Sequence, residues 1–486
     1  MNRSFYNGIS GIKTHQFGID TWADNIANQN MYGFKENLPE FENLFSQTMA
    51  TTTYNPSMND MGLGSSVQRT SLDLSTGELI DSDRNFDTAI DGHGWYGFIG
   101  KEETYYTKLG SFHRDIDGNL VNDNGEYLLG TSNSSIKLAK LSDEKLQSFG
   151  QAYTKDGLEN PKIYTVDLDE DTPLADIKSQ GKIKLPDLLY IPARPTKHLT
   201  FGANLDNEVE SKIDPATSKE VAKSSDHFTT SLINADGNKN ILDMTFTKQF
   251  PELAEGSKWS SEFKILKDVG KKDASVQYDP TKYITYPTDD TLYEIVDDKT
   301  GSLKFDGTGA LVEANIPLLD NEGTEVTLSL GTPLNPDIPN SGYDGITAVK
   351  GLSSETKVIS NDGKEEGLLH DYKIHPDGNI VATFTNGDSA SVGKIAIYHF
   401  RNEQGLQKIN ANMFIQSNNS GKAFFYSNDG KYINGDRILT QKIENSNVQT
   451  SVAMSELIIM QKAFDANAKS ITTSDQMIQK AINMKK

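Results

Sequence analysis

Apolar residues recur at heptad spacing near both ends of the chain, and this pattern restricts the folds that the chain can adopt. In the first segment the steps alternate between four and three residues, with Gln16 and Ala23 filling two positions. Its apolar positions are Phe5, Ile9, Ile12, Ile19 and Ile26. In the last segment a seven-residue repeat runs through Leu457, Phe464, Ile471 and Ile478, with companions at Met454, Gln461, Ala468, Asp475 and Ile482.

Such spacing predicts an amphipathic helix in each terminal segment. Either helix alone would suit the margin of an ordinary globular domain. Because heptads occur at both ends of the chain, with a different pattern between them, we expect the two helices to pair as a coiled coil.

The interior, from about Gly62 to Ile438, is divided by dipeptides that favour tight turns. Asp117-Gly118, Asn124-Gly125 and Asp377-Gly378 supply residues that tolerate the positive φ angles of hairpin turns. Short β-favouring runs lie between such turns, for example Ile380–Phe384 and Lys394–Tyr398. The expected fold is therefore mainly β, with outer domains that are β-sandwiches or barrels, around a helical core made of the paired ends.

These patterns divide the chain into five expected segments. The charged stretch Ser142–Leu185 is read as an insertion with some helix at Asp143–Leu146. The expected segments are an N-terminal helix and linking stretch (1–70), the first part of an inner β-domain (71–140), outer β-domains with the insertion (141–355), the return part of the inner β-domain (356–440) and a C-terminal helix (441–486).

Charge and composition exclude several function classes. The 486 residues include 47 Lys and Arg against 68 Asp and Glu, a formal net charge of −21. Such an acidic chain argues against nucleic acid or an anionic membrane as a main partner. The absence of cysteine excludes disulfides and thiolate chemistry. The first twenty residues carry no uninterrupted apolar run, so neither a cleaved Sec-type signal nor membrane insertion is expected.

Motifs that resemble catalytic or binding sites lack the context that such sites need. Gly92–Gly97 matches the G-x-G-x-x-G pattern, but strand-like sequence follows it where a dinucleotide site requires a helix. The acidic run Asp167–Asp171 lacks the glycine and the bidentate glutamate of a calcium loop. His93 and His113 lie in strand-like sequence without metal-ligand spacing. We therefore expect no catalytic residue, no cofactor and no metal.

Two distinctive blocks lie near the start of the chain. One is Ser4–Ile12, with the sequence SFYNGISGI, and the other is Asp24–Lys35, with the sequence DNIANQNMYGFK. Both blocks resemble the corresponding segments of flagellar rod and hook proteins. The family usually has Asn where Asp24 stands. Within the second block, Asn25, Asn28, Gly33 and Phe34 are expected to shape the turn that ends the first helix, since Asn and Gly tolerate the backbone angles needed there.

Further blocks follow in the order typical of this family. They are Ala89–Tyr96, Tyr106–Phe112 with Asp117–Val121, Phe400–Leu406, Ser446–Val448 and Gln461–Lys469. Within the family, Gly202–Asp206, Leu242–Lys248 with Trp259, Leu303–Phe305 with Gly309–Val312, and Tyr372–Gly387 resemble the hook outer domain, which short rod proteins lack. These segments favour a hook protein over a rod protein. The long stretch Ser46–Met61 and the insertion Ser142–Leu185 leave a distal rod or rod–hook junction subunit as the alternative.

The resemblance implies a structural, non-enzymatic subunit that is exported without cleavage through the flagellar type III apparatus. It implies a helical homopolymer at the hook or basal body, outside the cell, that transmits torque and encloses the export channel. The implied partners are further copies of the chain and the rod, hook-cap and hook–filament junction proteins. The heptad residues of both ends would form the self-assembly seam. An enzyme or carbohydrate-binding protein on the same scaffold would instead require clustered carboxylates in Ser142–Leu185.

Overall fold

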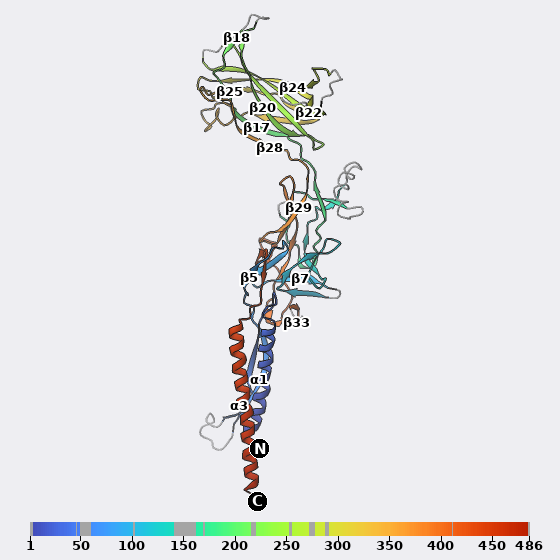
Figure 1. The fold of residues 1–486 in the computed structure, drawn as a ribbon, viewed down its shortest axis with the longest axis vertical. Helices are drawn as coiled ribbons and strands as arrows, with labels where there is room; N and C mark the ends of the chain where they lie inside the picture. Colours follow the sequence, from blue (N-terminus) through green and yellow to red (C-terminus); the bar gives the residue numbers. More distant parts are fainter. Residues whose placement is uncertain are drawn as a thin grey trace. The chain divides into compact units, whose positions relative to one another are not determined.

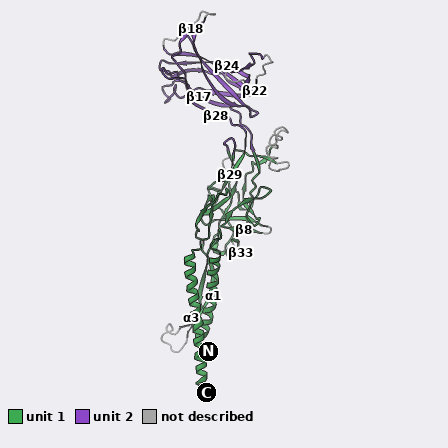
Figure 2. Cartoon of the chain, viewed as in Figure 1, with its two compact units in different colours: residues 1–189, 369–383, 389–486 green, residues 190–368, 384–388 purple. Residues whose placement is uncertain are grey.

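The computed structural model describes residues 3–44, 46–48, 60–100, 103–139, 162–168, 171–214, 220–251, 255–271, 278–286, 291–410 and 412–484. Contacts divide the chain into two compact units, coloured separately in Figure 2. Unit 1 comprises residues 1–189, 369–383 and 389–486, and unit 2 comprises residues 190–368 and 384–388. These divisions differ from the expected outer range 141–355. Residues 181–182 remain in unit 1 because they pair with its sheet strand β12.

Helices occupy the two terminal segments, as predicted, and strands dominate the described residues between them. Helix α1 is Arg3–Ala27 and helix α3 is Thr450–Asn483. The two helices lie side by side in Figure 1. The predicted helix at Asp143–Leu146 lies outside the described residues. A mainly β chain with one helix at each end is confirmed.

Unit 1 is built around a large, mostly antiparallel sheet. Its main strand order is β13-β14-β16-β29-β30-β31-β12-β7-β8-β34-β33, and β10, β11, β15 and β32 branch from it. These strands are β7 (Trp95–Ile99), β8 (Thr104–Thr107), β10 (His113–Arg114), β11 (Leu120–Val121), β12 (Tyr127–Ser132), β13 (Lys137–Leu138), β14 (Ile163–Thr165), β15 (Gly181–Lys182), β16 (Leu188–Ile191), β29 (Gly367–Ile374), β30 (Asn379–Phe384), β31 (Ser389–Ile395), β32 (Ile397–Tyr398), β33 (Gln407–Asn410) and β34 (Met413–Ile415).

Smaller sheets complete unit 1 and join residues that are distant in sequence. β37 (Arg437–Thr440), β6 (Asp87–Asp91) and β9 (Gly110–Ser111) form one of them, and β38 (Lys442–Glu444) pairs with β5 (Leu79–Asp81). The other pairs are β1 (Asn37–Asn43) with β4 (Ser65–Leu72), β2 (Ser46–Thr48) with β3 (Asp60–Gly62), and β35 (Tyr426–Asn428) with β36 (Lys431–Ile433). Short 3-10 helices span Ile177–Ser179 and Glu403–Gly405.

The glycines of the G-x-G-x-x-G pattern lie in a strand–turn–strand element of unit 1. Gly92 has φ of +150° in the turn after β6, and β7 begins at Trp95. A strand therefore follows the glycines, as predicted, and no helix opens there to hold a pyrophosphate. Trp95 packs edge-to-face on Phe414 at 5.0 Å between ring centres, within an aromatic core shared with Tyr106 and Tyr398.

Unit 2 consists of β-strands around a single apolar core. One sheet has the order β26-β27-β17-β28, a second has the order β20-β21-β22-β24-β23 with β25 on β24, and β18 pairs with β19 in a third. The first two sheets supply residues to the core, including Phe201, Phe246, Trp259 and Phe305. The strands are β17 (His198–Asn204), β18 (Ser211–Ile213), β19 (Glu220–Ala222), β20 (Asp226–Ile233), β21 (Lys239–Lys248), β22 (Ser257–Lys271), β23 (Tyr283–Ile284), β24 (Thr291–Phe305), β25 (Leu311–Asn315), β26 (Leu319–Asn321), β27 (Thr324–Ser329) and β28 (Glu355–Asn361).

Candidate functional site

Helix α1 approaches helix α3 most closely at Gly8, Gly11 and Gly18, which we call the glycine line. The fully buried positions of α1 are Gly8, Gly11, Thr14, Gly18, Trp22 and Asn25. A Cβ atom added at Gly8 would lie 2.8 Å from Ile471 Cγ1, and one added at Gly18 would lie 3.0 Å from Met460 Sδ. The absence of side chains at these glycines therefore lets the two helices approach closely.

The predicted seam of α1 lies one residue along from this buried line. Each of its five apolar positions is partly exposed in the single chain: Phe5, Ile9, Ile12, Ile19 and Ile26. Sequence reasoning missed the glycine line because it followed apolar side chains only. The heptad-like spacing of Gly8, Gly11 and Gly18 was the signal that could have found it.

On α3 the predicted repeat lies partly on the face toward α1. Leu457, Phe464 and Ile471 are half-buried, whereas Ile478 is exposed. The inner companion positions are Ala453, Met460, Asn467 and Ser474, one residue before the predicted Met454, Gln461, Ala468 and Asp475. The exposed residues Met477 and Ile482 lie beyond this contact.

Replacing Gly8 with valine is expected to weaken the contact between α1 and α3. The new Cβ would lie 2.8 Å from the Ile471 side chain and 3.3 Å from the Asn467 carbonyl oxygen. Overpacking of this kind costs about 1–3 kcal/mol, although valine itself favours a helix more than glycine does. Amide hydrogen exchange in α1 measures the weakened helix contact, and it is expected to be faster in the variant than in the wild-type protein. Ala23→Val, on the exposed face of α1, is the control, and equal exchange in both variants would contradict the predicted close contact.

Beyond α1 the chain turns sharply and returns toward the segment that precedes α3. Asn25 is fully buried; its side-chain amide donates to the Asn37 carbonyl oxygen at 2.8 Å, and its Oδ1 accepts from the Asn37 N–H at 3.0 Å. Asn28 Nδ2 donates to the Asp24 carbonyl oxygen at 2.9 Å. Gly33 has φ of +68° and donates its N–H to the Glu444 carbonyl oxygen at 2.8 Å. The four predicted turn residues therefore lie at this return, with Phe34 buried against Trp22 and Val448.

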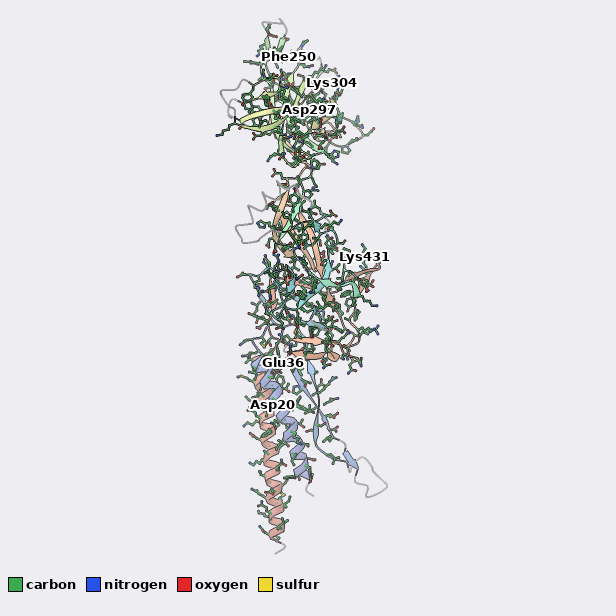
Figure 3. All side chains as sticks on the ribbon, turned by 90° about the vertical axis from the view of Figure 1, so that its right-hand side faces the viewer. Asp20, Glu36, Phe250, Asp297, Lys304 and Lys431 are labelled. Carbon is green, nitrogen blue, oxygen red and sulfur yellow. The ribbon has the colours of Figure 1, made fainter. Side chains whose placement is uncertain are left out.

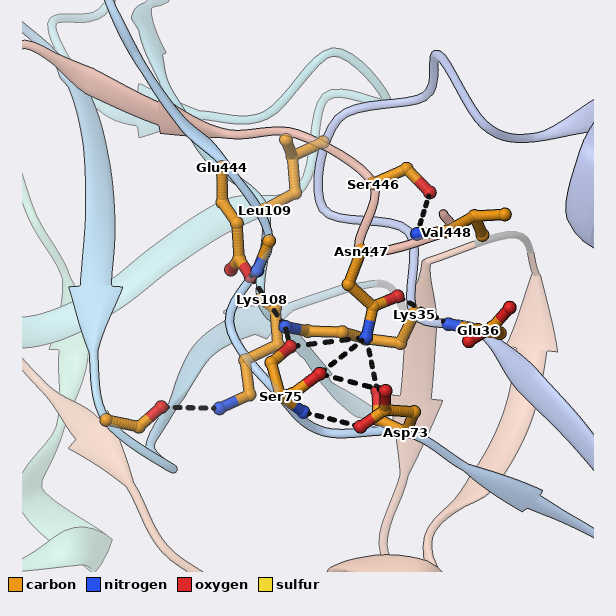
Figure 4. A network of polar contacts seen from close by, with 12 residues as sticks. Lys35, Glu36, Asp73, Ser75, Lys108, Leu109, Glu444, Ser446, Asn447 and Val448 are labelled. Atoms are coloured by element: carbon orange, nitrogen blue, oxygen red, sulfur yellow. Dashed lines mark hydrogen bonds and ion pairs between the residues drawn. The ribbon is translucent and has the colours of Figure 1, made fainter. Parts of the chain in front are cut away.

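A buried ion pair joins the segment after α1 to the segment before α3. Lys35 Nζ lies 2.6 Å from Glu444 Oε1, and the two side chains are only 3% and 4% exposed. Lys35 Nζ also donates to the Ser75 carbonyl oxygen at 2.7 Å, and the Gly77 N–H donates to Glu444 Oε1 at 2.7 Å. Figure 4 shows these contacts, which we call the polar junction together with Asn447.

Asn447 binds the same three segments through its side-chain amide. Its Oδ1 accepts from the Glu36 N–H at 2.8 Å, and its Nδ2 donates to the Asp73 carbonyl oxygen at 2.9 Å. The polar junction therefore fixes the residues next to α1, the 73–77 loop and the residues next to α3 in one place. The sequence did not predict the Lys35–Glu444 pair, although Lys35 and Asn447 both fall in blocks that resemble the family.

Lys108 is a second buried cation close to the polar junction. Its side chain is 3% exposed, its Nζ donates to the Gly92 carbonyl oxygen at 3.2 Å, and the ammonium group lies 5.0 Å from the centre of the Trp95 ring. Burial lowers the pKa of Lys108 from 10.5 to about 8, and nearby Glu403 opposes this decrease. Lys35 lowers the pKa further, whereas Glu444 and Asp436 raise it.

This lowered pKa predicts a stability that increases with pH. Between pH 8 and pH 10.5 the unfolded chain binds a proton on Lys108 that the folded chain does not bind, so folding becomes more favourable as the pH rises. Urea unfolding at pH 7 and pH 10 measures how much the free energy of unfolding increases between the two pH values. This increase is expected to be about 2–3 kcal/mol larger for the wild-type protein than for Lys108→Met. The same pH dependence in both proteins would contradict the prediction.

The described residues present no arrangement suited to metal chemistry. Among them, no group of three or more His, Asp or Glu side chains is placed to hold a metal ion. The acidic run Asp167–Asp171 lies partly outside the described range. No helix in the described part of the chain is long and apolar enough to cross a membrane.

Two family models match parts of this chain. Residues 89–185 match the flagellar hook protein FlgE/F/G D1 domain, and residues 440–484 match the flagellar basal body rod FlgEFG protein C-terminal domain. The first match runs through the stretch Ser142–Leu185, which was expected to belong to the outer domains. The second match covers α3.

Several known proteins are similar to this chain. The flagellar hook protein FlgE of Borreliella burgdorferi is 27% identical, and the match covers all of both chains. That of Salmonella typhimurium is 25% identical over 99% of this chain and 100% of the relative. The flagellar basal-body rod protein FlgG of Bacillus subtilis is 36% identical over 28% of this chain and 54% of the relative. The crystal structure of Helicobacter pylori flagellar hook protein FlgE2 aligns with a TM-score of 0.43 at 14% identity, over 74% of this chain and 98% of that chain.

Proposed function

We propose that this chain is a member of the flagellar rod and hook axial protein family and that it is the structural subunit of the flagellar hook. The observation that carries this proposal is the similarity to hook proteins along the whole chain, which includes unit 2. The similarity to the rod protein covers little more than a quarter of the chain.

Self-assembly is supported by the apolar surface that the terminal helices leave exposed. The seam residues Phe5, Ile9, Ile12, Ile19 and Ile26 are only half-buried in the single chain. On α3, Val452, Ile458 and Ile459 are exposed, as are Met477, Ile478 and Ile482 near its end. In a polymer, neighbouring copies would cover these side chains and remove them from water.

We propose that the paired helices form a coiled-coil inner layer around an export channel. Contacts that repeat from copy to copy without closing produce an open helical filament. The outer β-domains would slide past one another as the tube bends, which would let it work as a universal joint that transmits torque from the rod to the filament. The seam residues, including Leu457, Phe464 and Ile471, would be buried within and between copies.

The partners and the location of such a subunit follow from this role. Hook subunits bind one another and other flagellar proteins, and we propose the rod, the hook cap and the hook–filament junction proteins as the neighbours of this polymer. We propose that the chain passes through the type III export apparatus without cleavage and assembles outside the cell.

Electron microscopy of basal bodies from a deletion strain tests the choice between hook and rod. Loss of the gene is expected to leave complete rods without hooks, and a plasmid copy of the full chain should restore the hooks. Truncated rods would instead assign the chain to the distal rod or the rod–hook junction, the alternative function.

A further inference from the structure

A pocket of about 450 Å³ lies beside the polar junction, between the 73–78 loop and the start of α3. Three carboxylates line it, from Glu36, Asp73 and Glu78, together with the apolar side chains of Val448 and Val452. We call it the acidic pocket. All of its lining residues belong to unit 1.

Glu36 is the least satisfied group of the acidic pocket. The residue as a whole is 8% exposed, and its Oε1 is buried without a hydrogen-bond partner among the described residues. The backbone of Glu36 is held by Asn447 Oδ1 and by the Asp73 N–H, which donates to the Glu36 carbonyl oxygen at 2.8 Å. In Figure 4 the Glu36 carboxylate extends away from Lys35 and Asn447, and Figure 3 marks its position in the chain.

The carboxylates of the acidic pocket lack an ion-pair partner within the described part of the chain. Burial raises the pKa of Glu36, and the negative charge of Asp73 raises it further. Asp73 uses its oxygens to accept from the N–H and the hydroxyl of Ser75, both at 2.9 Å. Among the described residues, no Lys or Arg forms an ion pair with Glu36, Asp73 or Glu78. A buried carboxylate without a cationic partner is costly, and an arriving cation would remove that cost.

We propose that the acidic pocket receives a lysine or arginine side chain from a second copy of this chain. The inference rests on the proposed polymer and adds a specific contact between copies. The pocket far exceeds the space that a bare metal ion needs, and the described residues offer no cluster of three metal ligands. Val448 and Val452 suit the aliphatic stem of a long basic side chain, while Glu36 and Asp73 suit its charged head. The net charge of −21 makes copies repel at long range, so such a local attraction would select one docking position.

Crosslinking within assembled tubes tests this contact directly. Thr76, an exposed lining residue, is replaced by a benzophenone amino acid in the full chain, and tubes are isolated from a strain without its own copy of the gene. Irradiation is expected to join neighbouring copies, with the link on a peptide that carries a Lys or Arg next to the crosslinked residue. Adding Glu36→Gln should reduce the yield about tenfold, because it removes a charge-assisted hydrogen bond.

The matched control is Glu42→Gln, which removes an exposed carboxylate of β1 outside the pocket and should leave the yield unchanged. Unfolding of monomeric Glu36→Gln should occur at the wild-type temperature or above it, which separates a lost contact from a lost fold. The pocket proposal alone would be overturned by crosslinks on peptides that lack a basic residue, or by equal crosslinking yields in both variants. Calorimetry that shows binding of Ca²⁺ or Mg²⁺ alone at Glu36 would also overturn it. Failure of the wild-type chain to form tubes would overturn both this proposal and the proposed function.

Discussion

Deletion of residues 458–486 is expected to give a soluble monomer that forms no tube. The deletion removes Met460, Asn467 and Ile471, the residues of α3 that contact the glycine line of α1. A helix of 25 residues that has lost this partner is marginal in water, so the order of α1 decreases. Size-exclusion chromatography of the purified chain and electron microscopy of cells that express it are the measurements.

A shorter deletion separates contacts within the chain from contacts between copies. Removal of residues 475–486 keeps the part of α3 that meets α1 but removes the exposed Met477, Ile478 and Ile482. This variant is expected to keep the wild-type hydrogen exchange of α1 and to assemble poorly. Normal tubes from the chain that lacks residues 458–486 would refute the assignment of the helices to assembly.

Replacement of Lys35 by methionine is expected to destabilise unit 1 by about 3–5 kcal/mol, because it leaves the Glu444 carboxylate buried without its cation. Glu444 Oε1 would keep the Gly77 N–H donor at 2.7 Å, and the Ser75 carbonyl oxygen would lose its Lys35 donor. Urea unfolding in a Trp259→Phe background measures this loss, because Trp22 and Trp95 then report on unit 1 alone.

The matched control uses an exposed ion pair at the same edge of unit 1. Lys442 pairs with Asp81 between β38 and β5, and the two side chains are 38% and 87% exposed. Lys442→Met should therefore cost no more than about 1 kcal/mol. The double variant Lys35→Met with Glu444→Gln should recover part of the loss, since the uncompensated charge is gone. A loss at Lys35 no larger than that at Lys442 would show that the buried pair does not stabilise the fold.

Sequence periodicity predicted the elements of this fold better than their packing. The apolar repeats located α1 and α3, and turn glycines such as Gly118 and Gly378 have the positive φ that the predicted hairpins require. The contact face of α1 was displaced by one position, because glycine contributes no apolar signal to a periodicity although it permits the closest approach between helices. Small residues were overlooked on α3 for the same reason. The predicted companion positions Met454 and Asp475 therefore lie one residue after the buried Ala453 and Ser474.

The polar junction could not be predicted from local patterns. Lys35 and Glu444 are 409 positions apart, and neither has a neighbour in sequence that identifies its partner. The sequence also does not predict that the Glu36 carboxylate is buried without a partner. Glutamates are common on protein surfaces, and only its burial distinguishes Glu36 from them.

The pairing of α1 with α3 also determines the order in which the chain can fold. The core of unit 2 draws only on residues between Leu199 and Ala348, so it can form from contacts that are comparatively near in sequence. By contrast, Gly8 meets Ile471 only after more than 400 intervening residues are available. Contacts of such long range form slowly and late. The helices therefore close only when both ends of the chain are available, at a stage when a growing polymer can offer its own surface as a template.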